Sequence, residues 1–320
     1  NLESVKPGLY TVELPDYGVN VRLTTTDRAG LHEYTFTDEQ SAILIDPCTG
    51  ACGDRTTDWS LEVVDPTHVK GFRHSEGWAN HIVYFVAEFS QPIIGQEEMH
   101  IVHDEYATAL KFDTSKEKKV LVKVGISAVS CENAAENLAA ELSGWDFDRV
   151  YAETKNKWNE ELGRIDIEPM DEKQQRIFYT AMYHSMIAPS LFSDVNGEYR
   201  GADGKNHQAE EKQYTMLSLW DTYRAAYPLF TLINEEMSTS LVFTFMNIYE
   251  QQGTLPVWHL QGWETNCMPG NQAVICLADL CLKGYVKDVR KLIDEVKPEV
   301  ELEYWAASWW PLPGTAQNWA

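Results

Sequence analysis

Basic residues are few in this sequence, which has 26 Lys and Arg against 49 Asp and Glu and a formal net charge of −23 at pH 7. Nucleic acids and anionic membranes attract basic surfaces, so this balance argues against both as partners. Long apolar runs are also missing, because none reaches the roughly 18–20 residues that a membrane-spanning helix needs. The excess carboxylates are left to bind cations or sugar hydroxyls.

Cysteine is too sparse for a disulfide scaffold, with six residues in a chain of 320. The stretch PCTGAC, with Cys48 and Cys52, lacks the second Cys or His pair that a zinc site needs. The G-x-G-x-x-G, Walker, HExxH and G-x-S-x-G patterns are absent, so nucleotide, zinc-protease and serine-hydrolase functions have no support. The chain opens at Asn1 with no signal peptide, which fits a mature form or a fragment.

The first 130 or so residues contain short β-branched or aromatic runs separated by turn residues, with no strong helical pattern between them. Seven such runs predict an antiparallel β-sandwich over residues 1–130. The predicted strands cover residues 8–14, 20–26, 32–37, 41–46, 68–74, 81–89 and 119–129.

The composition changes near Cys131, where Ala, Glu, Leu and Lys become frequent and apolar residues recur at helical spacing. We expect a helical linker over residues 131–165 and a helical domain over residues 166–320. Helices are predicted over 171–192, 235–253 and 271–284, and the last two end at glycine. The predicted fold is therefore α+β multidomain: a sandwich, a helical linker and helices paired into a bundle or toroid.

The stretch TMLSLWDTYRAAYPLF (215–230) places Trp220, Asp221 and Arg224 close together in a segment with an apolar body. If the segment is one helix, Asp221 and Arg224 share a face. Two interpretations follow. The pair is a surface ion pair worth roughly 0.2–0.5 kcal/mol, or it is a sugar subsite in which the charged groups bind hydroxyls and an indole covers the ring face.

The stretch GTLPVWHLQGWETNCMPGNQA (253–273) lies between two predicted helices and brings together Trp258, His259, Trp263 and Glu264. A loop on a rigid helical frame is a common place for binding groups. Each residue also has a structural interpretation: the tryptophans can plug the loop, His259 can bond locally, and Glu264 can cap the next helix. GFRHSEGWANHIVYF (71–85) shows no metal-ligand spacing and is interpreted as a polar strand connection.

Three of these stretches and the polar loop SDVNGEYRGADGK (193–205) together resemble glycoside hydrolase family 92, the calcium-dependent exo-acting α-mannosidases. The three stretches contribute SLWDTYRAAYPLFTLI, LPVWHLQGWETNCMPG, and GFRHSEGWAN with VYFVAEFS. The resemblance runs in order from about Pro7 to Gly284. It implies an N-terminal β-sandwich, a helical linker and an (α/α)6 barrel. It also implies inverting hydrolysis with an acid and a base, and a calcium ion at the mannose 2- and 3-hydroxyls.

The chain departs from the family in length, since members are about twice as long and carry sequence before this chain begins. The family's Glu-Gly-Asn-containing and Gly-Asn-Asp-Asp-like motifs are absent, so the acid and base are expected in a missing half of the barrel. The resemblance makes Asp221 and Arg224 candidates for the −1 subsite, with Trp258, Trp263 and Glu264 on the rim. It identifies no calcium ligand.

The expected function is the release of terminal α-linked mannose from glycans. The 320-residue chain alone is expected to be inactive. The expected location is periplasmic or extracellular. Two alternatives stay open. One is another enzyme with a sandwich and a toroid, such as a phosphorylase or a lyase. Phosphorolysis needs basic residues at the pocket, whereas these motifs are acidic and aromatic. The other is a non-catalytic glycan-binding module, which the missing motifs favour for the chain as given.

Overall fold

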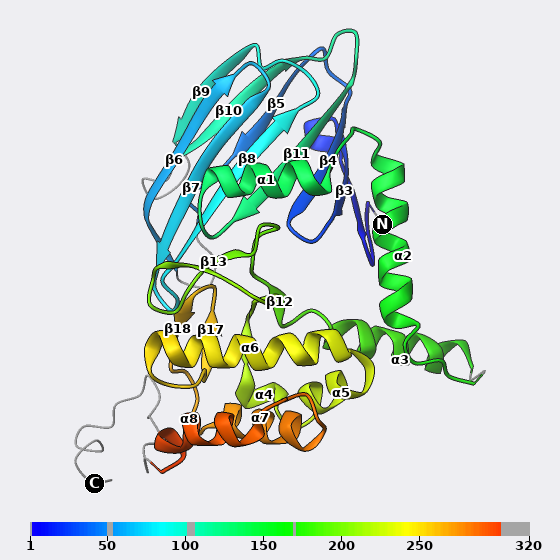
Figure 1. Ribbon diagram of the computed structural model, residues 1–320. Coiled ribbons are helices and arrows are strands. Elements are labelled where there is room, and N and C mark those ends of the chain that lie inside the picture. The colour runs from blue at the N-terminus through cyan, green and yellow to red at the C-terminus, as the bar shows by residue number, and fades with distance from the viewer. Residues whose placement is uncertain (1, 50–53, 101–105, 169–170, 302–320) are drawn as a thin grey trace. The chain divides into compact units, whose positions relative to one another are not determined.

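The computed structural model describes residues 2–49, 54–100, 106–168 and 171–301. The chain forms two compact units (Figure 1). The first contains residues 1–77, 82–163 and 194–196, and the second contains residues 78–81, 164–193 and 197–320. The predicted domain boundaries at 130 and 165 stay a prediction. The part of the third predicted domain from residue 302 onward lies outside the described residues.

The first unit is built on two facing β-sheets. The strand pairs with a defined register in both sheets are antiparallel. The larger sheet has eight strands, in the order β1 (Glu3–Lys6), β2 (Leu9–Leu14), β3 (Val19–Thr25), β4 (Ala29–Phe36), β11 (Lys119–Ser127), β8 (His81–Phe89), β7 (His68–Glu76) and β6 (Arg55–Asp65). The smaller sheet has the order β5 (Gln40–Ile45), β10 (Tyr106–Asp113) and β9 (Gly95–His100).

Side chains from both sheets alternate into a shared core, as expected for a sandwich. Leu110 and Phe112 of β10 pack there with Val120 of β11 and Val69 of β7, and all four are fully buried. The predicted antiparallel sandwich is confirmed. Each of the seven predicted runs contains a strand, while β1, β6, β9 and β10 are additional strands that were not predicted.

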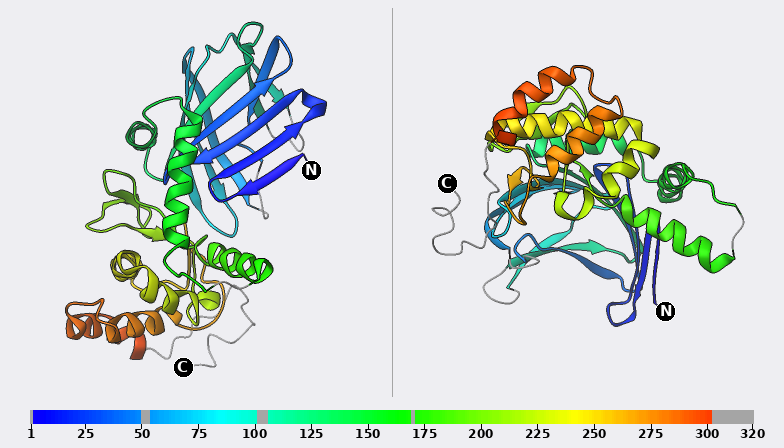
Figure 2. Two further views of the ribbon diagram at one scale, coloured as in Figure 1. Left: turned by 90° about the vertical axis from the view of Figure 1, so that its right-hand side faces the viewer. Right: turned by 90° about the horizontal axis from the view of Figure 1, so that it is seen from below.

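Two helices cover the outer face of the larger sheet (Figure 2, left). Helix α1 (Cys131–Glu141) packs on β11, and helix α2 (Phe147–Leu162) packs on β3 and β4. Their N-caps are Ser130 and Asp146, whose side chains accept from the backbone N–H three residues on. A second apolar cluster fills this layer, with Leu31 of β4 against Leu138 and Val150 of the helices.

The second unit is mainly helical, as predicted. Its helices are α3 (Glu172–Ser185), α4 (Leu219–Thr222), α5 (Ala226–Ile233), α6 (Glu235–Gln252), α7 (Gln272–Leu282) and α8 (Val289–Glu301). Gly253 follows α6 and Gly284 follows α7 with positive φ values of 81° and 85°, as the helix-ending glycines of the sequence predicted. Leu241 and Phe245 of α6 centre the core of this unit, where α5, α6 and α7 meet. Closure of the helices into an (α/α)6 barrel stays a prediction.

Short strands connect the helices. They are β12 (Ser190–Leu191) with β15 (Tyr214–Thr215), β13 (Glu198–Arg200) with β14 (Asn206–Gln208), and a three-stranded sheet of β16 (Leu217–Ser218), β17 (Trp258–Leu260) and β18 (Trp263–Glu264). This last sheet joins two stretches that the sequence marked as chemically interesting.

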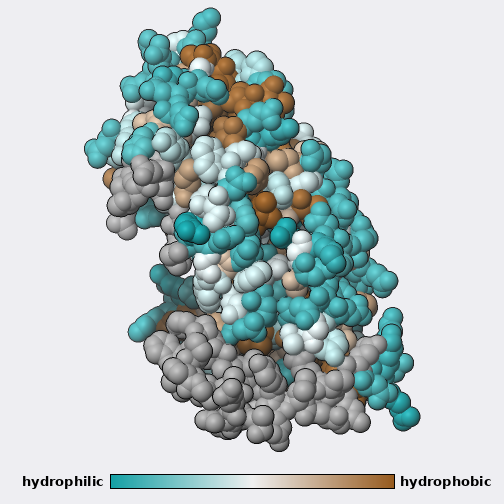
Figure 3. Space-filling view, turned by 90° about the vertical axis from the view of Figure 1, so that its left-hand side faces the viewer, coloured by the Kyte–Doolittle hydropathy of each residue, from teal (hydrophilic) through white to brown (hydrophobic). Residues whose placement is uncertain are grey.

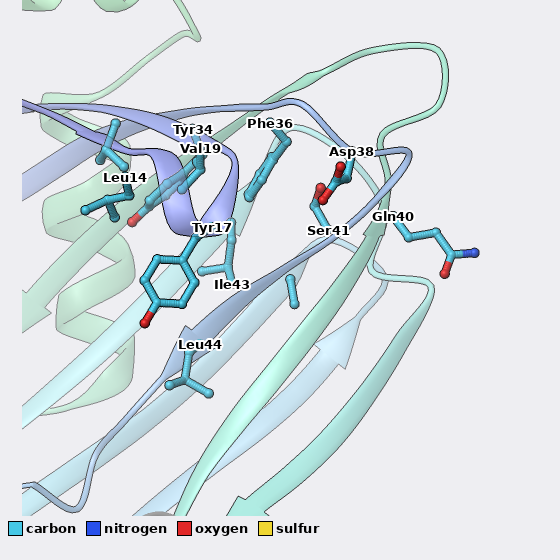
Figure 4. Close-up of a pocket in the computed structure, with 12 residues that line it drawn as sticks. Leu14, Tyr17, Val19, Tyr34, Phe36, Asp38, Gln40, Ser41, Ile43 and Leu44 are labelled. Carbon is cyan, nitrogen blue, oxygen red and sulfur yellow. The ribbon is translucent and has the colours of Figure 1, made fainter.

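A cavity of about 370 Å³ lies in the sandwich, and all of its lining residues belong to the first unit (Figure 4). It opens where the larger sheet extends past β5, which is an edge strand of the smaller sheet. Its lining is mostly apolar, and Tyr17 on the short 3-10 turn Pro15–Tyr17 is 76% exposed beside it. The single charged side chain of the lining is Asp38. This composition is that of an uncovered part of the sandwich core.

Apolar side chains also gather at the upper end of the sandwich in the space-filling view, above a largely hydrophilic surface (Figure 3). The turn after β6 and the segment after β8 are joined by a hydrogen bond in which the N–H of Ile93 donates to the carbonyl of Pro66 at 2.6 Å. Val64 and Ile94, close to these two residues in the chain, are each more than half exposed. Scattered exposed apolar residues are ordinary on protein surfaces, so we attach no function to them.

Candidate functional site

The sheet of β16, β17 and β18 is the frame of the candidate site. Leu217 pairs with His259, Ser218 with Trp258, His259 with Glu264, and Leu260 with Trp263. The β17–β18 hairpin turns on Gln261 and Gly262, which both have positive φ values (50° and 84°). A two-residue loop of this kind matches the twist of its strands but strains a residue such as glutamine.

Strain is concentrated around this small sheet. In the ranges that the structure describes, four non-glycine residues have positive φ: Met216, Gln261, Asn266 and Met268. Met216 directly precedes β16, Gln261 lies in the hairpin, and the other two follow β18 within four residues. Such residues cost of order 1–3 kcal/mol each and tend to cluster where function requires a fixed geometry. The observation therefore marks these strands as a functional candidate.

Asp221 lies in the four-residue helix α4, which begins directly after β16. Leu219 anchors this helix with a fully buried side chain, while Asp221 and Trp220 are exposed. Three residues of helix advance the chain by about 4.5 Å, so Asp221 lies close to Ser218 and thus to the end of β16 that pairs with Trp258. In the part of the chain that the structure describes, the Asp221 carboxylate has no hydrogen-bond or ion-pair partner.

Arg224 is also exposed, and it lies in the turn between α4 and α5. Its Nε donates to the Tyr223 hydroxyl at 2.7 Å, and its guanidinium lies 5.1 Å from the centre of that ring. No ion pair joins it to Asp221 within the described ranges. The expected single helix over these residues is wrong, because the helical structure is interrupted between Thr222 and Ala226.

Pro228 explains the interruption. A proline inside a helix clashes with the carbonyl four residues earlier, here that of Arg224, and cannot donate a hydrogen bond. Helix α5 therefore starts at Ala226, with Pro228 in its first turn. Asp221 and Arg224 do not share a helix face, so the surface ion pair that their spacing allowed does not form.

The two faces of the small sheet differ in chemistry. Side chains alternate along strands and paired residues share a face, so Ser218, Trp258, Leu260 and Trp263 lie on one face, opposite Leu217, His259 and Glu264. Trp263 is 43% exposed and Trp258 is partly exposed. The Trp258 ring lies 5.8 Å from the ring of Trp78, at an interplanar angle of 54°. Leu260 on this face is buried, so its exposed surface comes mainly from the two tryptophans.

The opposite face is buried. Glu264 is partly buried, and its carboxylate accepts from the backbone N–H groups of Val257, Trp258 and Asn266 at 2.8–2.9 Å. Burial raises the pKa of Glu264 above its usual value, and these N–H donors act against that rise. His259 is 3% exposed, and both of its ring nitrogens lack hydrogen-bond partners. Burial lowers the pKa of His259 from 6.5 to about 4, so the imidazole is neutral at pH 7.

The structure thus brings Trp258, Trp263 and Glu264 into one hairpin and places Asp221 just beyond the neighbouring strand. Trp78 lies in GFRHSEGWAN, which was part of the family resemblance, but the sequence analysis gave it no role in the site because it interpreted residues 71–85 as a polar strand connection. Residues 78–81 belong to the second unit, as Trp258 does.

A metal site is not supported by the described residues. No three His, Cys, Asp or Glu side chains among them are grouped so that they could hold one ion. The described residues therefore offer no group of three carboxylates for a calcium ion. Within the described ranges, every helix is too short or too polar to span a membrane.

Two family models match the chain. The glycosyl hydrolase family 92 N-terminal domain matches residues 1–127, and the glycosyl hydrolase family 92 catalytic domain matches residues 133–309. Among curated proteins, the chain is 24% identical over 329 residues to an uncharacterized secreted glycosidase from Arthroderma benhamiae, which covers 91% of this chain and 38% of that protein.

Among solved structures, a family 92 α-mannosidase from Bacteroides thetaiotaomicron superposes with a TM-score of 0.86 at 31% identity. The match covers 92% of this chain and 43% of that one. A family 92 inverting mannosidase from the same species gives a TM-score of 0.83 at 27% identity, covering 92% and 42%. The chain thus spans less than half the length of the relatives that it matches. With the catalytic-domain match covering more than half of its residues, the chain belongs to glycosyl hydrolase family 92.

Proposed function

We propose that this chain is a large part of an exo-acting α-mannosidase that releases terminal α-linked mannose from glycans. The observation that carries the proposal is the exposed Asp221, which has no partner among the described residues and lies just beyond the strand that pairs with Trp258. The family's solved members include α-mannosidases. One of those α-mannosidases has been solved in complex with mannoimidazole. A carboxylate next to open indole rings suits a pyranose, which offers hydroxyls at its rim and an apolar ring face.

Each candidate residue then has a role. Asp221 accepts hydrogen bonds from mannose hydroxyls, and Arg224 donates to a hydroxyl or ring oxygen from the adjoining turn. Trp258 and Trp263 provide apolar surface for the sugar. Glu264 acts through the hairpin that carries the tryptophans. The other four residues bind substrate, and none of the five is proposed as the acid or the base.

The proposed reaction is inverting hydrolysis, in which one carboxylic acid protonates the glycosidic oxygen and a carboxylate activates water on the far side. These two groups are separated by about 6.5–9.5 Å in such enzymes. We place both of them in the part of the full-length enzyme that this chain does not include, and we assign no residue as a ligand of the proposed calcium ion. Calcium would supply a hard cation for the mannose hydroxyls. A periplasmic or extracellular location is proposed, and the matched A. benhamiae protein is described as secreted.

The direct test is Asp221→Asn in the full-length enzyme. Loss of a charged hydrogen bond to a hydroxyl costs about 1.5–3 kcal/mol, so kcat/KM for an α-mannoside should fall roughly ten- to a hundredfold while the Tm stays nearly unchanged. Asp166→Asn is the matched control, since Asp166 is exposed in the same unit and has no bond within the described ranges. An unchanged kcat/KM with a lowered Tm would make Asp221 structural.

The alternatives are separated by two further measurements. The 320-residue chain should not cleave a mannobiose, and turnover at a normal enzymatic rate would show that its own carboxylates catalyse. In the full-length protein, cleavage that depends on added phosphate would indicate a phosphorylase, and an unsaturated product would indicate a lyase. Mannoside binding without any cleavage by the full-length protein would indicate a glycan-binding module.

A further inference from the structure

The Glu264 carboxylate accepts most of its hydrogen bonds from backbone N–H groups. Oε1 accepts from the N–H groups of Trp258 and Asn266, and Oε2 accepts from that of Val257. The Gln252 side chain is a further hydrogen-bond partner. A carboxylate can accept about four hydrogen bonds, so this one has little capacity left for a sugar hydroxyl. By strand alternation it also lies on the face of the sheet opposite the tryptophans.

The donors come from both sides of the hairpin. Val257 and Trp258 lead into it and Asn266 leaves it, so one carboxylate ties the two arms together. The segment between these donors, residues 257–266, contains two of the strained positions, Gln261 and Asn266. Strained backbone persists only where the surroundings determine it strongly. Charge-assisted bonds, which are about twice as strong as neutral ones, meet that requirement.

One of the three donors is the backbone of Trp258 itself, at 2.8 Å. The Trp258 ring in turn lies against Trp78, which is 48% exposed. Fixing the Trp258 main chain therefore fixes where its indole meets that of Trp78. We infer that Glu264 is a positioning residue that holds Trp258 against Trp78, and that Trp78 and Trp258 together form an aromatic surface for the apolar face of a pyranose ring.

The assignment of a sugar to this surface rests on the proposed function, whereas the positioning role does not. Two indoles at this separation couple their electronic transitions, which gives a paired positive and negative band in circular dichroism. That signal reports the geometry of Trp78 and Trp258 without any ligand. This coupled signal is defined as the difference between the circular dichroism spectra of the unmodified 320-residue chain and its Trp258→Phe variant. The Trp78→Phe substitution should remove the same bands.

The positioning test is Glu264→Gln, recorded well below the Tm, with far-UV circular dichroism to show that the fold is intact. The amide has the same size but replaces one acceptor oxygen with an N–H₂ group that faces backbone donors. We expect the coupled signal to fall by half or more. Glu211→Gln is the control, because Glu211 is exposed and has no bond within the described ranges, and this variant should retain the coupled signal.

If Glu264→Gln misfolds, Glu264→Asp is the second variant. It keeps the charge but cannot reach all three donors, so it should also reduce the coupled signal. A full signal in a folded Glu264 variant overturns the positioning role.

The proposed contact of a sugar ring with Trp78 and Trp258 is tested separately, by calorimetric titration of mannoimidazole into the full-length enzyme. Losing one stacked ring by Trp78→Ala should weaken binding about two- to tenfold. Unchanged affinity in Trp78→Ala, with affinity lost in Asp221→Asn, overturns the role of Trp78. Unchanged affinity in both variants overturns the proposed sugar site at Asp221, while the circular dichroism result still decides the role of Glu264.

Discussion

Mild acid should destabilise this chain through one buried imidazole, that of His259. Its side chain is 3% exposed in β17, and burial lowers its pKa from 6.5 to about 4. The folded chain therefore holds a neutral imidazole over a pH range in which the unfolded chain would protonate it. Because the unfolded state binds the extra proton, the free energy of unfolding falls as the pH falls from about 6.5 towards 4.

The size of the effect follows from these pKa values. Between pH 7 and pH 5 the unfolded imidazole becomes almost fully protonated, whereas about a tenth of the folded one does. One pKa unit corresponds to about 1.4 kcal/mol, so the free energy of unfolding should drop by about 2 kcal/mol across this interval from His259 alone.

The assay is urea unfolding at pH 7 and pH 5 for the unmodified chain and for His259→Leu. Leucine removes the titration and loses no hydrogen bond, since both ring nitrogens are without partners. The variant should therefore lose about 2 kcal/mol less than the unmodified chain between the two pH values. His184→Leu, at an exposed position of the same unit, should show the pH dependence of the unmodified chain. Equal pH dependence in His259→Leu would refute the reasoning.

Two further substitutions test the first unit. Asp194 is 4% exposed and accepts from Ser127, Asn133 and Asn137 at 2.6–2.8 Å, so Asp194→Ala should lower the free energy of urea unfolding by on the order of 3 kcal/mol. The exposed Asp16→Ala should change it little, and equal effects would contradict the buried role. Leu44 is 52% exposed on the edge strand β5 beside the cavity, so Leu44→Lys should reduce self-association in light scattering. Leu282→Lys, at a helical position that is 89% exposed, is the control, and an equal effect there would implicate general charge instead of the edge.

The sandwich could be predicted from the sequence where strands alternate β-branched or aromatic residues with polar ones. Strand β10 (YATALKFD) escaped that test although Leu110 and Phe112 are fully buried. Ala107 and Ala109 lie on the opposite face of the strand from Leu110 and Phe112 and are also buried, and alanine is a poor strand former. The burial of these residues comes from packing against other strands. That packing depends on residues distant in the chain, so local composition does not reveal it.

The helical unit could be predicted from periodicity and from the glycines that end α6 and α7. The same periodicity failed over residues 215–230, where an apolar pattern suggested one helix. Two features prevent a single helix. In a continuous helix Pro228 would clash with the carbonyl of Arg224, and Leu217 and Ser218 are paired with β17 as a strand. The proline was visible in the sequence, but the strand pairing depends on a partner some forty residues away.

The candidate site shows the same limit in its chemistry. Sequence adjacency suggested that Trp263 and Glu264 face one rim together, yet neighbouring residues of a strand point to opposite faces. The rim that the structure presents consists of indoles, and the carboxylate behind it bonds to the backbone of Trp258. A motif of an acid beside a tryptophan therefore fits two arrangements, direct contact with the ligand or support from behind. The number of backbone N–H donors on the carboxylate distinguishes them. A count of three favours support for Glu264, whereas Asp221, with no partner among the described residues, fits direct contact with the ligand.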